Sequence, residues 1–183
     1  MDSKRLMILI LIIISLFFVA KFAMQDSGKS GSDGGPVAQK QPGPYSEGSS
    51  DKAAEFSMNS ISGGKIKLSD YAGKVIILDF WATWCPPCKA EIPFFIELYK
   101  QYKKDGLVII GAALDEKSKV VSFVKKNGVN YPVGLGDQKL GQLYGGIRGI
   151  PTTFVIDRKG NIVSKYVGFR PKQVFEQDFL DLK

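Results

Sequence analysis

Two apolar runs dominate the hydrophobic pattern of the chain. Residues 75–80 read VIILDF and residues 107–114 read LVIIGAAL, and a single acid, Asp79, interrupts the first run. Neither run alternates apolar with polar positions. A continuous apolar run of this length is typical of a strand buried on both faces. The pattern therefore predicts two central strands of a sheet that is covered on both sides.

Apolar residues recur at intervals of three and four in the segments that follow these runs. The spacing predicts a helix over residues 88–104 with a kink at Pro93, and a second helix over residues 117–127 that ends at Gly128. Two shorter helices are expected over residues 138–144 and 173–180.

Shorter strands are predicted at both ends of this region. Phe56 and residues 65–68 indicate two strands around the Gly63-Gly64 turn, which makes an N-terminal β-hairpin. Residues 153–157 and 162–167 flank another turn and predict a second hairpin. Strands that alternate with helices imply an α/β fold in which a sheet containing parallel strands is flanked by helices.

The amino terminus has a different pattern. Residues 6–20 carry no charge, and their extension to residue 24 reaches the roughly 17 residues needed to cross hydrocarbon. Lys4 and Arg5 precede the stretch and favour a cytoplasmic amino terminus. We therefore expect residues 1–5 in the cytoplasm and residues 6–24 as a transmembrane signal-anchor in the bacterial cytoplasmic membrane.

A cleaved signal peptide is the alternative for this stretch, although large residues such as Phe18 and Phe22 stand where a cleavage site needs small ones. Both interpretations place the remainder on the extracytoplasmic, or periplasmic, face. Residues 25–53 are rich in Gly, Ser, Pro and Gln and predict a flexible linker, so that residues 54–183 form the folded domain.

Composition excludes several kinds of chemistry. The 183 residues include no histidine and two cysteines, so neither a Ser-His-Asp triad nor a histidine-ligated zinc site can form within the chain. The formal charge of +7 comes from scattered lysines without an arginine-rich block, a pattern that argues against a nucleic-acid partner.

The two cysteines form a WCPPC segment, residues 84–88, directly after the strand at 75–80 and at the start of the next helix. A helix amino terminus stabilises negative charge, so Cys85 is placed to act as a thiolate. Cys88 lies one turn further on the same face, where it can resolve a mixed disulfide on Cys85. Half of a zinc site shared with a second chain and an inert disulfide remain as alternatives.

The segments around this dithiol resemble a known family. DFWATWCPPC (79–88) resembles the active-site segment of thioredoxins, and GIPTTFVID (149–157) resembles their cis-proline loop. CKAEIP (88–93) is similar to the TlpA/ResA/DsbE-type membrane-tethered reductases. The resemblance covers roughly residues 54–182 and implies a thioredoxin-like fold with a central mixed sheet.

The resemblance also implies roles for individual residues. Cys85 would be the exposed nucleophile, Cys88 the resolving thiol, and Pro151 a cis residue that faces them, with the backbone beside it pairing with an extended substrate. The redox-active Cys85–Cys88 disulfide would be the only redox group, with no bound cofactor or metal. The residues expected to contact substrate are Trp84, Pro86, Pro87, Ile150, Pro151 and Thr152.

Two acids could move protons for the dithiol. A carboxylate at Asp79 would be buried in an apolar strand, which should raise its pKa. Glu91 lies three residues after Cys88 on the same helical face. We expect both to relay the proton of Cys88. Because Pro86 and Pro87 have no amide hydrogen to donate to the Cys85 sulfur, we also expect a reducing couple.

These features predict an exported, membrane-anchored, monomeric protein-disulfide reductase. The resemblance implies exported proteins as substrates, with apocytochrome c among them, and a CcdA/DsbD-type membrane thiol transporter as the electron donor. One alternative is a thiol peroxidase of the peroxiredoxin type, whose chemistry requires a lone peroxidatic cysteine. The other is a Sco-type copper-delivery protein, which uses a wider cysteine spacing and a histidine.

Overall fold

A computed structural model describes residues 52–183 of the chain. The predicted signal-anchor (6–24) and nearly all of the predicted linker (25–53) lie outside the described residues. Within residues 52–183, no helix is both long enough and apolar enough to cross a membrane. Lys52 and Ala53 belong to the folded part, because Lys52 forms a bridge with Asn161 and the Ala53 amide donates to the Gly160 carbonyl at 2.9 Å.

The two apolar runs form the centre of the sheet, as predicted. β3 (Val75–Trp81) and β4 (Leu107–Ala113) pair in parallel, and every residue of both strands is buried. Their continuous apolar sequences follow from this position, since side chains on both faces of these strands contact packed layers rather than water.

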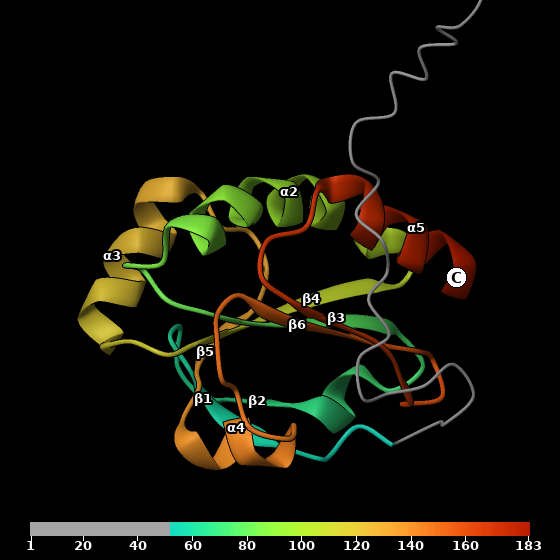
Figure 1. The fold of residues 1–183 in the computed structure, drawn as a ribbon, viewed down its shortest axis with the longest axis horizontal. Helices are drawn as coiled ribbons and strands as arrows, with labels where there is room; N and C mark the ends of the chain where they lie inside the picture. The colour runs from blue at the N-terminus through green and yellow to red at the C-terminus, as the bar shows by residue number, and fades with distance from the viewer. Residues whose placement is uncertain (1–51) are drawn as a thin grey trace, which may run out of the picture. The chain divides into compact units, whose positions relative to one another are not determined.

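The remaining strands complete a seven-stranded mixed sheet in the order β2-β1-β5-β4-β3-β6-β7 (Figure 1). β5 runs parallel to β4, and β6 pairs antiparallel with β3, so the sheet is mixed. Both expected hairpins are present, one at each edge of the sheet. The bounds of these strands are β1 (Ser57–Ser60), β2 (Lys65–Lys67), β5 (Val133–Leu135), β6 (Thr152–Ile156) and β7 (Ile162–Val167).

Helices cover both faces of the sheet. α2 (Pro86–Tyr102), α3 (Lys117–Asn127) and α5 (Lys172–Leu182) lie on one face, and α4 (Gln138–Leu143) lies on the other (Figure 1). α3 ends at Gly128, which has a φ of 65°, a left-handed conformation that glycine adopts without strain. Two short 3-10 turns, η1 (Leu68–Tyr71) and η2 (Lys103–Asp105), connect neighbouring elements.

Two apolar clusters hold these layers together. One lies between the sheet and the three-helix side, where Trp81, Phe95 and Phe175 are buried. The other lies on the α4 side around Phe80 and Tyr144. Asp79 is on the same face of β3 as Trp81, so its carboxyl group points into the first cluster, beneath α2.

The structure differs from the sequence-based expectation in two elements. α2 begins at Pro86 rather than at residue 88, because both prolines fit its first turn, where the missing amide hydrogens cost little. β5 was not expected, since it has only three residues between Pro132 and Gly136 and its pairing with β1 and β4 is set by tertiary contacts.

Candidate active site

Cys85 and Cys88 form a disulfide at the amino terminus of α2. Cys85 is the residue that caps the helix, and its Sγ accepts the amide hydrogen of Cys88 at 3.2 Å. The two prolines between them donate nothing, as expected, but the sulfur has this one backbone donor. The Cys88 amide was not predicted as a donor, because it reaches the sulfur only once the first turn of α2 has formed.

The disulfide is more covered than the sequence suggested. Cys85 is 3% exposed and Cys88 is 1% exposed, so the expectation of an exposed Cys85 is wrong for this oxidised form. The residues beside them are open to solvent: Trp84 is 65% exposed, and Pro86 and Pro87 are also exposed. The two sulfur atoms are therefore buried, whereas Trp84, Pro86 and Pro87 beside them are exposed to solvent.

The loop that covers Cys85 contains the cis proline. The Ile150–Pro151 peptide bond is cis, which confirms that expectation, and the Ile150 carbonyl oxygen lies 3.7 Å from Cys85 Sγ. Thr152 is buried, and its hydroxyl donates to the Gly149 carbonyl at 2.6 Å. The Pro151 carbonyl accepts the Gly168 amide at 2.8 Å, so it is already paired within the chain. The structure thus brings the predicted substrate-contacting residues together around one sulfur.

Asp79 is buried at the centre of the sheet. It is 1% exposed, and the Thr153 hydroxyl donates to its Oδ1 at 3.2 Å. Burial raises its pKa well above the ordinary value of 3.8, and the nearby carboxyl of Glu91 raises it further, while the Thr153 hydrogen bond opposes both. The raised pKa that was expected for Asp79 is confirmed, and it makes the deprotonated Asp79 carboxylate a stronger proton acceptor than an ordinary aspartate.

Glu91 is buried as well, although a helix acid at this position could have faced solvent. It is 1% exposed, its Oε1 accepts the backbone amide of Arg170, and its Oε2 has no hydrogen-bond partner among the described residues. Burial raises the pKa of Glu91 from 4.5 to about 7, against the opposing effect of the Arg170 hydrogen bond and charge. A carboxyl group with this pKa can both take up and release a proton near neutral pH.

Tyr131 is a neighbour of these acids that the sequence did not reveal. Its hydroxyl is buried without a hydrogen-bond partner among residues 52–183. Burial raises the pKa of this phenol well above its ordinary value, and the charges of Asp79 and Glu91 add to the effect. The phenol is therefore neutral, and the three buried polar groups come from β3, from α2 and from the loop before β5.

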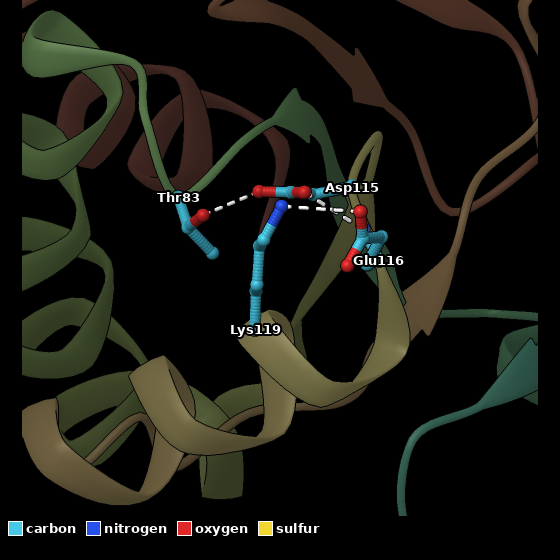
Figure 2. A network of polar contacts seen from close by, with 4 residues as sticks. All are labelled: Thr83, Asp115, Glu116 and Lys119. Carbon is cyan, nitrogen blue, oxygen red and sulfur yellow. Dashed lines mark hydrogen bonds and ion pairs between the residues drawn. The ribbon is translucent and has the colours of Figure 1, made fainter.

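A polar network fastens the loop that precedes the disulfide (Figure 2). The Thr83 hydroxyl donates to Oδ2 of Asp115, and Oδ1 of Asp115 accepts the Glu116 amide at 2.8 Å. Lys119 forms an ion pair with Glu116 at 3.1 Å. The Thr83 hydrogen bond lowers the pKa of Asp115, which keeps it charged as an acceptor. The network ties the chain just before Trp84 to the β4–α3 loop, a link between residues 32 positions apart.

The chemistry that this arrangement supports is cysteine-based. No group of three or more His, Cys, Asp or Glu side chains within residues 52–183 is arranged to hold a metal ion. The pair at the start of α2 can open and close by thiol–disulfide exchange, since one sulfur caps the helix and the other lies one turn deeper.

Comparison with known proteins finds the same chemistry in similar chains. The chain matches the AhpC/TSA family over residues 50–165. It is 39% identical over 127 residues to the thiol-disulfide oxidoreductase ResA from Bacillus thuringiensis (strain Al Hakam), which covers 68% of this chain and 73% of that relative. It is 37% identical over 139 residues to ResA from Bacillus subtilis (strain 168), which covers 75% of each.

A solved structure agrees with these relatives. The crystal structure of a thiol:disulfide interchange protein of the thioredoxin family from Chlorobium tepidum TLS superposes with a TM-score of 0.69 at 34% identity. The superposition covers 72% of this chain and 95% of that one. The described domain therefore has the thioredoxin-like fold that the two motifs indicated.

Proposed function

We propose that this chain, which belongs to the AhpC/TSA family and is a thiol–disulfide oxidoreductase of the ResA type, reduces disulfides in exported proteins. The observation that carries the proposal is the Cys85–Cys88 disulfide at the start of α2, with the cis-Pro151 loop against Cys85. The proposed direction and cellular location go beyond what the relatives' names state.

The reaction follows from the positions of the two sulfurs. In the reduced protein, the Cys85 thiolate attacks a substrate disulfide, forms a mixed disulfide and releases one substrate thiolate, which takes up a proton. Cys88 then loses its proton and attacks the Cys85 sulfur, which restores the internal disulfide and releases the second substrate thiol. Two electrons pass from the protein to the substrate, and Asp79 or Glu91 accepts the Cys88 proton and passes it on.

Several features favour the reducing direction. A strong oxidant needs its reduced form stabilised, chiefly by a stabilised thiolate. Here Pro86 and Pro87 provide no amide donor to the Cys85 sulfur, which leaves the Cys88 amide as its donor. The carboxyl groups of Asp79 and Glu91 are buried on the side of the sheet that α2 covers, where both cysteines also pack. Any negative charge on those groups disfavours a thiolate nearby. A reduction potential near about −120 mV, measured by equilibration with glutathione, would contradict this direction.

The location and partners of the reaction rest on the sequence outside the described residues. The apolar stretch at residues 6–24, which carries no charge up to residue 20, supports a membrane anchor with the domain on the extracytoplasmic face. An anchored reductase there needs a supply of electrons, for which a CcdA/DsbD-type membrane thiol transporter is the proposed donor. Apocytochrome c is the proposed substrate because its haem-binding cysteines must be reduced. The relatives' names do not favour a peroxidase or a copper-delivery protein.

A trapping experiment tests the function. Cys88→Ala removes the resolving thiol, so the variant should accumulate its substrates as mixed disulfides on Cys85, which mass spectrometry identifies after acid quenching. A Cys85→Ala variant is the matched control and should trap far less. If Cys88→Ala captures no exported protein in cells while the wild-type chain remains folded and reduced, the proposed function is wrong.

A further inference from the structure

Arg170 is a basic residue in the loop between β7 and α5, and its main chain contacts the buried acid of the active site. The Arg170 amide donates to Oε1 of Glu91, which lies one turn after Cys88 on α2. Glu91 is 1% exposed, whereas Arg170 is half-buried. Burying a carboxylate is costly unless a hydrogen-bond donor or an opposite charge lies close to it. Arg170 supplies both to Glu91.

The Arg170 side chain turns back onto its own loop. Its Nη1 donates to the Phe169 carbonyl at 2.8 Å. The guanidinium carbon lies 5.7 Å from the centre of the ring of Tyr166, a residue of β7 that is 2% exposed. A cation over the face of an aromatic ring is attracted by the electrons of the ring. These contacts fix the conformation of the loop that presents the Arg170 amide to Glu91.

Three titratable groups from other parts of the fold face Glu91. Asp79 comes from β3, Tyr131 from the loop before β5, and Arg170 from the loop after β7. Asp79 and the Tyr131 phenol are neutral or negative, so neither stabilises a carboxylate through its charge. Of the three, Arg170 alone is positive, and its charge opposes the effect of burial on Glu91. Arg170 therefore increases the fraction of Glu91 that is ionised near neutral pH.

We propose that Arg170 is a positioning residue for the exchange reaction, which holds Glu91 as the carboxylate that takes the proton from Cys88. The inference rests on the proposed function and extends it to the control of the proton step. In the mixed disulfide, Glu91 accepts the Cys88 proton, and the new thiolate attacks the Cys85 sulfur. The bond between Cys85 and the substrate sulfur breaks. The substrate sulfur leaves as a thiolate and takes up a proton from the solvent, to which Glu91 later returns the proton that it gained.

Two measurements on the full-length chain in a mild detergent test this inference. Carbon-13 NMR of the carboxyl groups follows the titration of Glu91 in the oxidised chain, and the Glu91 signal is assigned by its loss in Glu91→Gln. Stopped flow follows the reduced chain after it is mixed with one equivalent of Ellman's reagent. The first thionitrobenzoate is released when Cys85 attacks, and the second when Cys88 resolves the mixed disulfide. The rate of the second release, measured against pH, reports the step in which Cys88 loses its proton.

Arg170→Met removes the charge and keeps the backbone amide that Glu91 accepts. The NMR midpoint of Glu91, about 7 in the wild type, should rise by about one pH unit in this variant. The step in the pH profile of the second release that Glu91→Gln removes should move upward by the same amount. Arg170→Lys retains the charge and should restore most of the wild-type profile. Lys172→Met removes a nearby cation that pairs with Glu97, and it should leave the profile unchanged.

A double-mutant cycle separates an effect through Glu91 from a merely structural one. In the Glu91→Gln background, Arg170→Met should not change the second release any further, because the group through which Arg170 acts is absent. If Arg170→Met leaves the NMR midpoint of Glu91 unchanged, or slows the second release equally with and without Glu91, the inference is overturned while the reductase function stands. If the wild-type chain releases only one thionitrobenzoate, Cys88 does not resolve the mixed disulfide, and the proposed function is overturned with the inference.

Discussion

The buried carboxyl group of Glu91 should make the stability of the protein depend on pH, and Glu91→Gln isolates this effect. The glutamine side chain has nearly the same shape, and its amide oxygen can accept the Arg170 amide hydrogen that Glu91 accepts. The substitution therefore keeps the contact between α2 and the β7–α5 loop. It removes the titrating group.

The expected magnitude follows from the shifted pKa. Burial raises the pKa of Glu91 from 4.5 to about 7, so the folded protein binds the proton more tightly than the unfolded chain. Its contribution to stability is fully present below pH 4.5 and is lost as the pH rises through 7. At 1.36 kcal/mol for each pH unit between the two values, the loss is about 3 kcal/mol.

Urea unfolding of the full-length, oxidised chain at pH 4 and pH 8, followed by circular dichroism, measures this effect. Between pH 4 and pH 8 the wild type should lose about 3 kcal/mol in free energy of unfolding that the Glu91→Gln variant keeps. Asp79 titrates in both proteins, and because the Glu91 carboxyl group raises the pKa of Asp79, removing Glu91 changes the stability in the same direction.

The control is Glu97→Gln on the same helix. Glu97 has a 62% exposed side chain that pairs with Lys172. Glu97→Gln should therefore alter the pH 4 to pH 8 change in the free energy of unfolding by less than about 1 kcal/mol, relative to the wild type. If the difference between wild type and Glu91→Gln is the same at both pH values, within about 0.5 kcal/mol, burial does not raise the pKa of Glu91 and the reasoning fails.

Two further predictions concern the proton relay and the loop before the disulfide. The double variant Asp79→Asn/Glu91→Gln should slow exchange with hydroxyethyl disulfide at pH 7 at least about tenfold, because both proposed acceptors of the Cys88 proton are lost. A rate constant within about twofold of the wild type, measured by stopped flow, would contradict the relay. Thr83→Val removes the hydrogen bond to Asp115 and should lower the free energy of unfolding by about 1 kcal/mol, whereas Thr83→Ser should retain it. Urea unfolding measures both variants, and equal stability of the valine and serine variants would show that the network in Figure 2 contributes nothing.

The features of this protein that depend on neighbouring residues in the chain could be predicted from its sequence. The apolar runs predicted β3 and β4, because a strand buried on both faces needs nearly every side chain to be apolar. Gly128 ended α3 as predicted, since the required backbone conformation is a local property. The dithiol was predicted at a helix start from the strand before it and the helical spacing after it.

The surroundings of the dithiol depend on contacts between distant segments, which the sequence did not reveal. The sequence placed Glu91 on the same helical face as Cys88, but its burial depends on α2 packing against the sheet and on Arg170, 79 positions away. The cover over Cys85 comes from Ile150, 65 positions away, and could not be predicted from the exposed neighbours of the cysteine. Tyr131 carries no motif, so only its position in space shows its relation to Asp79 and Glu91.

The physical reason for this division is the range of the forces involved. Backbone geometry, helix caps and the alternation of apolar residues act over a few positions, and a sequence displays them directly. Burial, pKa shifts and hydrogen bonds between distant segments depend on which surfaces the fold brings into contact. The chemical identity of the site could therefore be predicted from the sequence. The exposure of the two sulfur atoms and the pKa values of the nearby acids depend on how α2, the cis-proline loop and the β7–α5 loop pack together.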